Sequence, residues 1–354
     1  YGEGASVALE RTHAFAMKSS MWLLDPRPNH AAIVRMVEKG FELSEASNTP
    51  VMMELRIRAC HVQGSFIASD NIAPAISSRL LQQEAAGFSY DRLSHPPSTF
   101  KHEKHKYEVR MPAARRFIED AGLNEHFDGL HADVGLIVQG GLYNTTLRAL
   151  QQAGLANGTG RSDIPMLVLN VVYPLVPSQI AAFCAGKRAV LVVEEGQPEF
   201  IEQDIATQLR RADLQTRLHG KDLLPMGGEY TAEILLKGIT AFVEQHLPAF
   251  DASAANAFST ELIEVKQSAL AALGGGVPAR PPNFCTGCPE RPVFAALKLV
   301  ENPERRAAMA EELGWEVEDF DKAFQEAFQQ GMVEADFKAR VMWVPNAIRH
   351  NKPE

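Results

Sequence analysis

Asp133-Val-Gly-Leu-Ile-Val-Gln-Gly-Gly141 joins the apolar run Val134 to Val138 to a glycine turn, and a helical pattern near 143–153 follows it. The same alternation continues downstream, with apolar runs at 166–172 and 189–193 and helical patterns near 176–185 and 200–211. Alternating buried strands and helices are typical of a mainly parallel sheet covered by helices. The sequence therefore predicts an α/β domain, closed by a helix over 232–246.

Weaker patterns flank this domain on both sides. Residues 30–46 have apolar side chains close to helical spacing, Asn48-Thr49-Pro50 ends that helix, and 51–58 alternates in its second half as a strand does. Residues 67–115, with the break His95-Pro96-Pro97 and the charged run Lys101 to Lys106, suggest a connecting region with one helix around 76–86. Residues 251–280 are rich in Ala, Ser and Gly, which predicts a helix followed by a linker.

Composition bounds the class of protein. A chain of 354 residues with 45% hydrophobic and 22% charged residues can bury several cores, so we expect a multidomain α/β protein. A net charge of −9 argues against nucleic acid as the main partner. The longest apolar runs fall short of the roughly 20 residues of a membrane span. No membrane contact and a cytoplasmic location are expected, and the first residues, which lack initiator Met and signal features, suggest a start inside a domain.

Cysteine spacing gives the strongest chemical signal. Cys285-Thr-Gly-Cys288 places two thiolates three residues apart around a glycine, so both can face one iron or zinc ion. Such a centre needs four ligands, and neither Cys60 nor Cys184 is an obvious third one. Cys285 and Cys288 are therefore predicted to be half of an iron–sulfur site, and the alternatives are a packed pair in a tight turn or a redox pair.

The order of several motifs resembles one enzyme family. The middle of the chain is similar to the transketolase-C-like domain of indolepyruvate ferredoxin oxidoreductase alpha subunits, in the 2-oxoacid:ferredoxin oxidoreductase superfamily. Residues 38–51 look like the last helix and strand of that family's pyrimidine-binding domain, and 281–298 look like the opening of its diphosphate-binding domain. The middle-domain motifs are Asp133 to Gly141, Val171-Val-Tyr-Pro-Leu175, Val192-Val-Glu-Glu-Gly196, His219-Gly-Lys221 and Pro225-Met-Gly-Gly-Glu229.

The resemblance implies a domain order. Residues 1–66 would be the C-terminal part of a pyrimidine-binding thiamine diphosphate domain, 67–132 a connecting region, and 133–250 the transketolase-C-like domain. A helix and linker over 251–280 would lead to the start of a diphosphate-binding domain over 281–300. An unrelated small α/β tail would occupy 301–354.

The resemblance also implies chemistry. Family members decarboxylate indolepyruvate and other aryl 2-oxoacids on thiamine diphosphate held with magnesium, pass electrons through iron–sulfur clusters to ferredoxin, and transfer the acyl group to coenzyme A. A second subunit is implied as well. The acid that activates thiamine diphosphate would precede Tyr1, and no Gly-Asp-Gly motif follows Lys298. We therefore expect the chain alone to be inactive.

Four further residues are candidates for cofactor contacts. Glu290 and Arg291 stand where the family pattern has a His beside the cofactor, and the alternative is a solvated acid favoured by a helix dipole. His219 and Lys221 could hold an anionic group such as a coenzyme A phosphate, and the alternative is a solvent-facing turn.

Two acids end an apolar strand. Glu194 and Glu195 stand where α/β sheets build sites, so they could contact a neighbouring subunit or domain, or instead cap the helix that follows.

The last residues suggest a rival function. Residues 339–354 look similar to a segment of phage-type replication proteins, although the tail has no clear basic face. Helices are predicted at 301–313 and 319–327, and a strand at 337–345. The rival hypothesis is a non-catalytic interaction protein with a DNA-binding tail.

Overall fold

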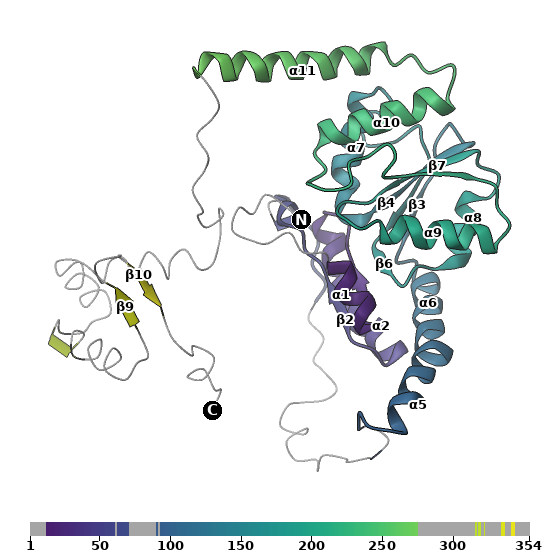
Figure 1. The fold of residues 1–354 in the computed structure, drawn as a ribbon, viewed down its shortest axis with the longest axis vertical. Helices are drawn as coiled ribbons and strands as arrows, with labels where there is room; N and C mark the ends of the chain where they lie inside the picture. The colour runs from purple at the N-terminus through teal and green to yellow at the C-terminus, as the bar shows by residue number, and fades with distance from the viewer. Residues whose placement is uncertain are drawn as a thin grey trace. The chain divides into compact units, whose positions relative to one another are not determined.

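The computed structural model describes residues 12–60, 62–70, 90, 93–274, 316, 318–319, 322, 334–336 and 341–343. The chain divides into two compact units, 1–279 and 280–354 (Figure 1). In the second unit, β9 (Glu334–Asp336) and β10 (Val341–Trp343) form an antiparallel pair, with Met342 opposite Ala335. The predicted strand at 337–345 is thus confirmed in its middle, and β9 was not expected from the sequence.

A five-stranded sheet forms the centre of the first unit. Its order is β3-β5-β4-β7-β8, and β3 runs antiparallel to its neighbour while the other pairs are parallel. This confirms the predicted mainly parallel sheet. The strands are β3 (Glu125–Phe127), β4 (Val134–Gln139), β5 (Met166–Leu169), β7 (Ala189–Val193) and β8 (Arg217–His219).

Helices cover both faces of this sheet (Figure 1). Side chains alternate along each strand, so Leu136 and Val138 enter one core while Ile137 enters the other. The first core is closed by α7 (Tyr143–Gln152) and α10 (Ala232–His246), and the second by α8 (Pro177–Cys184) and α9 (Phe200–Arg211). The helix α11 (Ser253–Ala272) follows and buries Ala255 against the first core.

A second, three-stranded sheet is built mainly from the N-terminal residues. Its order is β2-β1-β6, with β1 parallel to β2 and antiparallel to β6. The side chain of Asn29 caps the first turn of α2, and Asn48 ends that helix in the left-handed conformation, as Asn tolerates. The elements are α1 (Thr12–Ser19), β1 (Trp22–Leu24), α2 (His30–Ser47), β2 (Val51–Met53), α3 (Ile57–Cys60) and β6 (Val171–Tyr173).

The apolar run 166–172 forms two strands, not the single strand that its composition predicts. The chain leaves the central sheet at Asn170 and enters the second sheet as β6. The Asn170 side chain accepts from the Arg27 backbone N–H at 2.9 Å and donates to the Leu123 carbonyl at 2.8 Å. Because every residue from Met166 to Val172 is buried, the sequence pattern does not reveal where the chain changes sheet.

Two other segments differ from the sequence prediction. The strand expected over 51–58 ends at Met53, and the chain turns so that α3 begins at Ile57. The region expected to be mainly a connection contains α5 (Ser98–His105), a π-helical turn η2 (Lys106–Arg110) and α6 (Met111–Asp120). Its charged side chains occupy the solvent face, while Met111 and Ile118 pack in a core with Trp22. The helix predicted around 76–86 lies outside the described residues.

Candidate functional site

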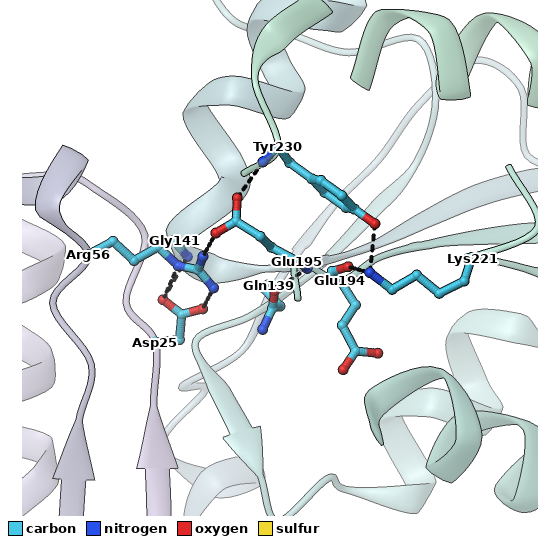
Figure 2. A network of polar contacts seen from close by, with 8 residues as sticks. All are labelled: Asp25, Arg56, Gln139, Gly141, Glu194, Glu195, Lys221 and Tyr230. Carbon is cyan, nitrogen blue, oxygen red and sulfur yellow. Dashed lines mark hydrogen bonds and ion pairs between the residues drawn. The ribbon is translucent and has the colours of Figure 1, made fainter. Parts of the chain in front are cut away.

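Polar side chains gather where the strands of both sheets end. Asp25 follows β1, the Gly140-Gly141 pair follows β4, Glu194 and Glu195 follow β7, and Lys221 comes shortly after β8. The carboxyl ends of parallel strands are where α/β sheets build their sites. Figure 2 shows Asp25, Gly141, Glu194, Glu195 and Lys221 in one network that spans the two sheets.

Arg56 lies at the centre of this network. Its Nη2 donates to Asp25 Oδ2 at 2.8 Å, its Nε to Asp25 Oδ1 at 3.2 Å, and its Nη1 to Glu195 Oε1 at 2.6 Å (Figure 2). The side chain of Arg56 is 6% exposed and those of both carboxylates are 1% exposed. The guanidinium therefore joins the end of β7 to the N-terminal module, by which we mean residues 12–60 with β1 and β2.

Burial alone would lower the pKa of Arg56. The charge and hydrogen bond of Asp25, with the charges of Glu54 and Glu195, outweigh burial and raise that pKa above its ordinary value. Arg56 therefore stays protonated. Its positive charge offsets the negative charges of Asp25 and Glu195, which would be costly to bury without a cation.

The two glycines make room for this arrangement. A Cβ at Gly140 would collide with the Asp25 carbonyl oxygen, and a Cβ at Gly141 would collide with the Arg56 guanidinium and with the Asp25 carboxylate. The Gly141 N–H donates to Asp25 Oδ1 at 3.1 Å. The glycine turn predicted from the sequence thus serves close packing of the N-terminal module.

Glu195 connects the network to the segment before α10. Its Oε2 accepts from the Tyr230 backbone N–H at 2.6 Å, and its own N–H donates to Gln139 Oε1 at 2.8 Å. Glu195 therefore contacts Tyr230 as well as Arg56, and its contact with a neighbouring subunit or a cofactor-bearing domain stays a prediction.

Glu194 has a different role from its neighbour. Its carboxylate accepts from the backbone N–H groups of Ile201, at 3.0 and 3.1 Å, and of Glu202, at 3.0 Å. These donors belong to the first turn of α9, so the helix-capping alternative is confirmed for Glu194.

His219 is buried, so the alternative that it belongs to a solvent-facing turn is wrong for this residue. Its Nδ1 lies 2.6 Å from Asp222 Oδ2, and its Nε2 lies 2.9 Å from His246 Nε2. Burial, together with the charges of His219, Arg188 and Arg217, lowers the pKa of His246. The pair forms a hydrogen-bonded link between β8 and α10.

Lys221 directs its ammonium into the network. Nζ donates to the Glu194 carbonyl at 2.6 Å and to the Tyr230 hydroxyl at 2.7 Å, and it lies 4.7 Å from the centroid of the Tyr230 ring. Its backbone N–H donates to Glu202 Oε2 at 2.9 Å. Cofactor binding by His219 and Lys221 stays a prediction, and the contacts seen are internal ones.

The other predicted site residues cannot be placed. Cys285, Cys288, Glu290 and Arg291 lie outside the described residues. Within the described ranges, no group of three or more His, Cys, Asp or Glu side chains could hold a metal ion. Cys184 is buried, and burial raises the pKa of its thiol to about 12, whereas Cys60 is exposed.

Sequence reasoning missed Asp25 and Arg56. A signal was present, because Asp25 directly follows the buried run Trp22-Leu-Leu24 and Arg56 closely follows β2. Charged residues at strand ends are common, however, and only the tertiary structure shows that these two meet.

The chain is similar to known proteins in its middle domain and beyond it. Residues 124–232, from the residue before β3 to the start of α10, match the family model described as the indolepyruvate ferredoxin oxidoreductase middle domain. The middle of the chain is thus similar to that domain. Indolepyruvate oxidoreductase subunit IorA of Methanothermobacter thermautotrophicus is 27% identical over 294 residues, which cover 80% of this chain and 41% of that protein. IorA of Pyrococcus abyssi is 26% identical over 307 residues, which cover 86% of this chain and 43% of that protein.

This chain therefore spans about two fifths of the length of the IorA proteins that it matches. A solved 2-oxoglutarate:ferredoxin oxidoreductase from Magnetococcus marinus aligns with 62% of this chain and 42% of its own, at 16% identity and a TM-score of 0.41. In the part of the chain that the structure describes, no helix has the length and apolar character needed to cross a membrane.

Proposed function

We propose that this chain is part of the alpha subunit of an indolepyruvate ferredoxin oxidoreductase. The reaction is the oxidative decarboxylation of indolepyruvate or another aryl 2-oxoacid, with thiamine diphosphate and coenzyme A as cofactors and ferredoxin as electron acceptor. The observation that carries the proposal is the match of residues 124–232 to the middle domain, extended by IorA relatives across 80% of the chain. A second subunit completes the enzyme.

The described residues contribute positioning rather than reactive groups. The Asp25–Arg56–Glu195 bridge and the close packing at Gly140 and Gly141 fix the N-terminal module on the central sheet. Rigid placement of one domain on another holds reacting groups in register, which lowers the entropic part of a barrier. We infer that this network keeps a cofactor-bearing domain correctly oriented.

The cofactors fit the described residues poorly. No metal-binding group is present among them, and the ammonium of Lys221 is already engaged by the Glu194 carbonyl and the Tyr230 hydroxyl. We therefore assign no step to thiamine diphosphate, magnesium or coenzyme A. The iron–sulfur site at Cys285 and Cys288 and the contacts of Glu290 and Arg291 are proposals from the sequence.

The test uses the native polypeptide that carries this sequence, isolated anaerobically with its second subunit. Indolepyruvate should reduce ferredoxin or a viologen dye only when coenzyme A and thiamine diphosphate are present. Pyruvate and 2-oxoglutarate serve as comparison substrates and should give a lower kcat/KM. Absence of reduction with every 2-oxoacid would refute the proposal, and salt-sensitive retention of the polypeptide on DNA would instead favour the tail hypothesis.

A further inference from the structure

A cavity of about 600 Å³ lies between the end of α1 and the helical column formed by α5, η2 and α6. The column runs continuously through these three elements (Figure 1). One wall is contributed by Met17, Lys18 and Ser20, and α5 and η2 contribute another. This cavity is separate from the network at the strand ends, since it shares none of that network's residues.

The wall that the column contributes is one helical face. Thr99, His102, Glu103, Lys106 and Arg110 line the cavity and follow one another at spacings of one, three or four residues. Residues three and four apart in a helix project from the same side. The π-helical turn forms the C-terminal part of this face, and such turns are frequent at functional sites.

Positive charge predominates in the cavity. Lys18, Lys106 and Arg110 line it with one acid, Glu103, although the whole chain carries a net charge of −9. The hydroxyl groups of Ser94 and Thr99 add hydrogen-bond donors. A local excess of cations on an acidic protein is the electrostatic pattern of an anion site.

The three cations have no acidic partner among the described residues. The ion pair seen on this column, Lys104 with Glu108 at 3.8 Å, includes none of these three cations. Arg110 Nε donates to His105 Nδ1 at 3.1 Å, which orients the guanidinium and leaves its terminal N–H groups for a ligand. Cations that share a cavity repel one another, so an anion bound there stabilises the arrangement.

We propose that this cavity binds a small phosphorylated molecule. Several N–H donors and an orienting hydrogen bond suit the oxygens of a phosphate group, which prefers charge-assisted hydrogen bonds. A volume of about 600 Å³ falls within the range of small-molecule sites, and a bounded cavity of this kind suits a small ligand better than an acidic polymer.

The test is calorimetric titration of the full chain with inorganic pyrophosphate at constant ionic strength. We expect saturable binding, weakened at least about tenfold in the variant Lys106→Gln/Arg110→Gln, because two charge-assisted contacts are lost. The matched control is Lys104→Gln/Arg116→Gln, which makes the same charge change on exposed positions of the same column. Its affinity should stay within about twofold of the original, since exposed charges outside the site act only through weak screened forces.

A third variant, Lys18→Gln, tests the opposite wall of the cavity. The proposal can therefore still be refuted if the double variant fails to fold. It should also weaken pyrophosphate binding by several fold. The proposal is overturned if the unsubstituted chain shows no saturable binding, or if Lys18→Gln and the control weaken binding equally. Binding of poly-glutamate in place of pyrophosphate would also overturn it, in favour of an acidic polypeptide partner.

Discussion

Replacing Arg56 with methionine should strongly destabilise the first unit. The substitution keeps much of the side-chain volume and removes three hydrogen bonds, two to Asp25 and one to Glu195. Both carboxylates, each 1% exposed, would lose the cation that offsets their charge. Removing one partner from a buried ion pair costs about 3–5 kcal/mol, most of it from the charge left behind.

Thermal unfolding followed by circular dichroism measures this effect. At about 2–4 °C per kcal/mol for a unit of this size, Arg56→Met should lower Tm by about 10 °C. Arg148→Met is the control, since Arg148 is exposed on α7 and its replacement should change stability by less than about 0.5 kcal/mol.

A double-mutant cycle isolates the bridge. Glu195→Gln removes the charge that Arg56 contacts but leaves Asp25 in place, so it should cost less than Arg56→Met does. The two changes together should cost less than their sum by about 1–3 kcal/mol, because both remove the same contact. Equal shifts for Arg56→Met and Arg148→Met, or strict additivity in the cycle, would refute the argument that this bridge fixes the module.

The remaining predictions concern packing, pH and metal. Gly141→Ala should lower the free energy of unfolding by about 2 kcal/mol or more, because its Cβ would collide with Arg56 and Asp25, whereas Gly158→Ala, which meets nothing within 4 Å, should cost less than about 1 kcal/mol in urea unfolding. The pKa of His246 is lowered in the folded chain, so the unfolded chain binds more protons. The stability of the fold should therefore fall as the pH drops from about 7 through the ordinary value of 6.5 toward 5. His246→Gln should flatten this dependence of Tm on pH. A dependence unchanged in His246→Gln would assign it to other groups. Cys285→Ser and Cys288→Ser should each reduce iron and acid-labile sulfide in the anaerobically purified native enzyme, and full retention of both in the two variants would exclude a cluster there.

The central fold could be predicted because its strands and helices follow strong periodic patterns. The helices 200–211 and 232–246 agree with the structure at both ends, since amphipathic spacing and the Thr231 cap are local signals. The edge strands β3 and β8 are short and carry polar residues such as Glu125 and Arg217, so no buried run marks them.

The candidate site could be predicted only in part. Glu194 and Glu195 were identified by their position at the end of a buried strand, and one of the two interpretations, capping by Glu194, proved correct. Arg56 lies 139 residues from Glu195 and 31 residues from Asp25 in the sequence. Local sequence patterns do not reveal contacts between residues so far apart. The same limit explains why the break at Asn170 escaped sequence reasoning.

The proposed function is tested most directly by one assay on the native alpha subunit polypeptide with its partner subunit, prepared without oxygen. Reduction of ferredoxin is recorded with indolepyruvate as the electron donor, in the presence and absence of coenzyme A. We predict steady reduction that requires coenzyme A and is faster with indolepyruvate than with 2-oxoglutarate. Failure of indolepyruvate and of every other 2-oxoacid to reduce ferredoxin, in a preparation that contains thiamine diphosphate and iron, would contradict the assignment.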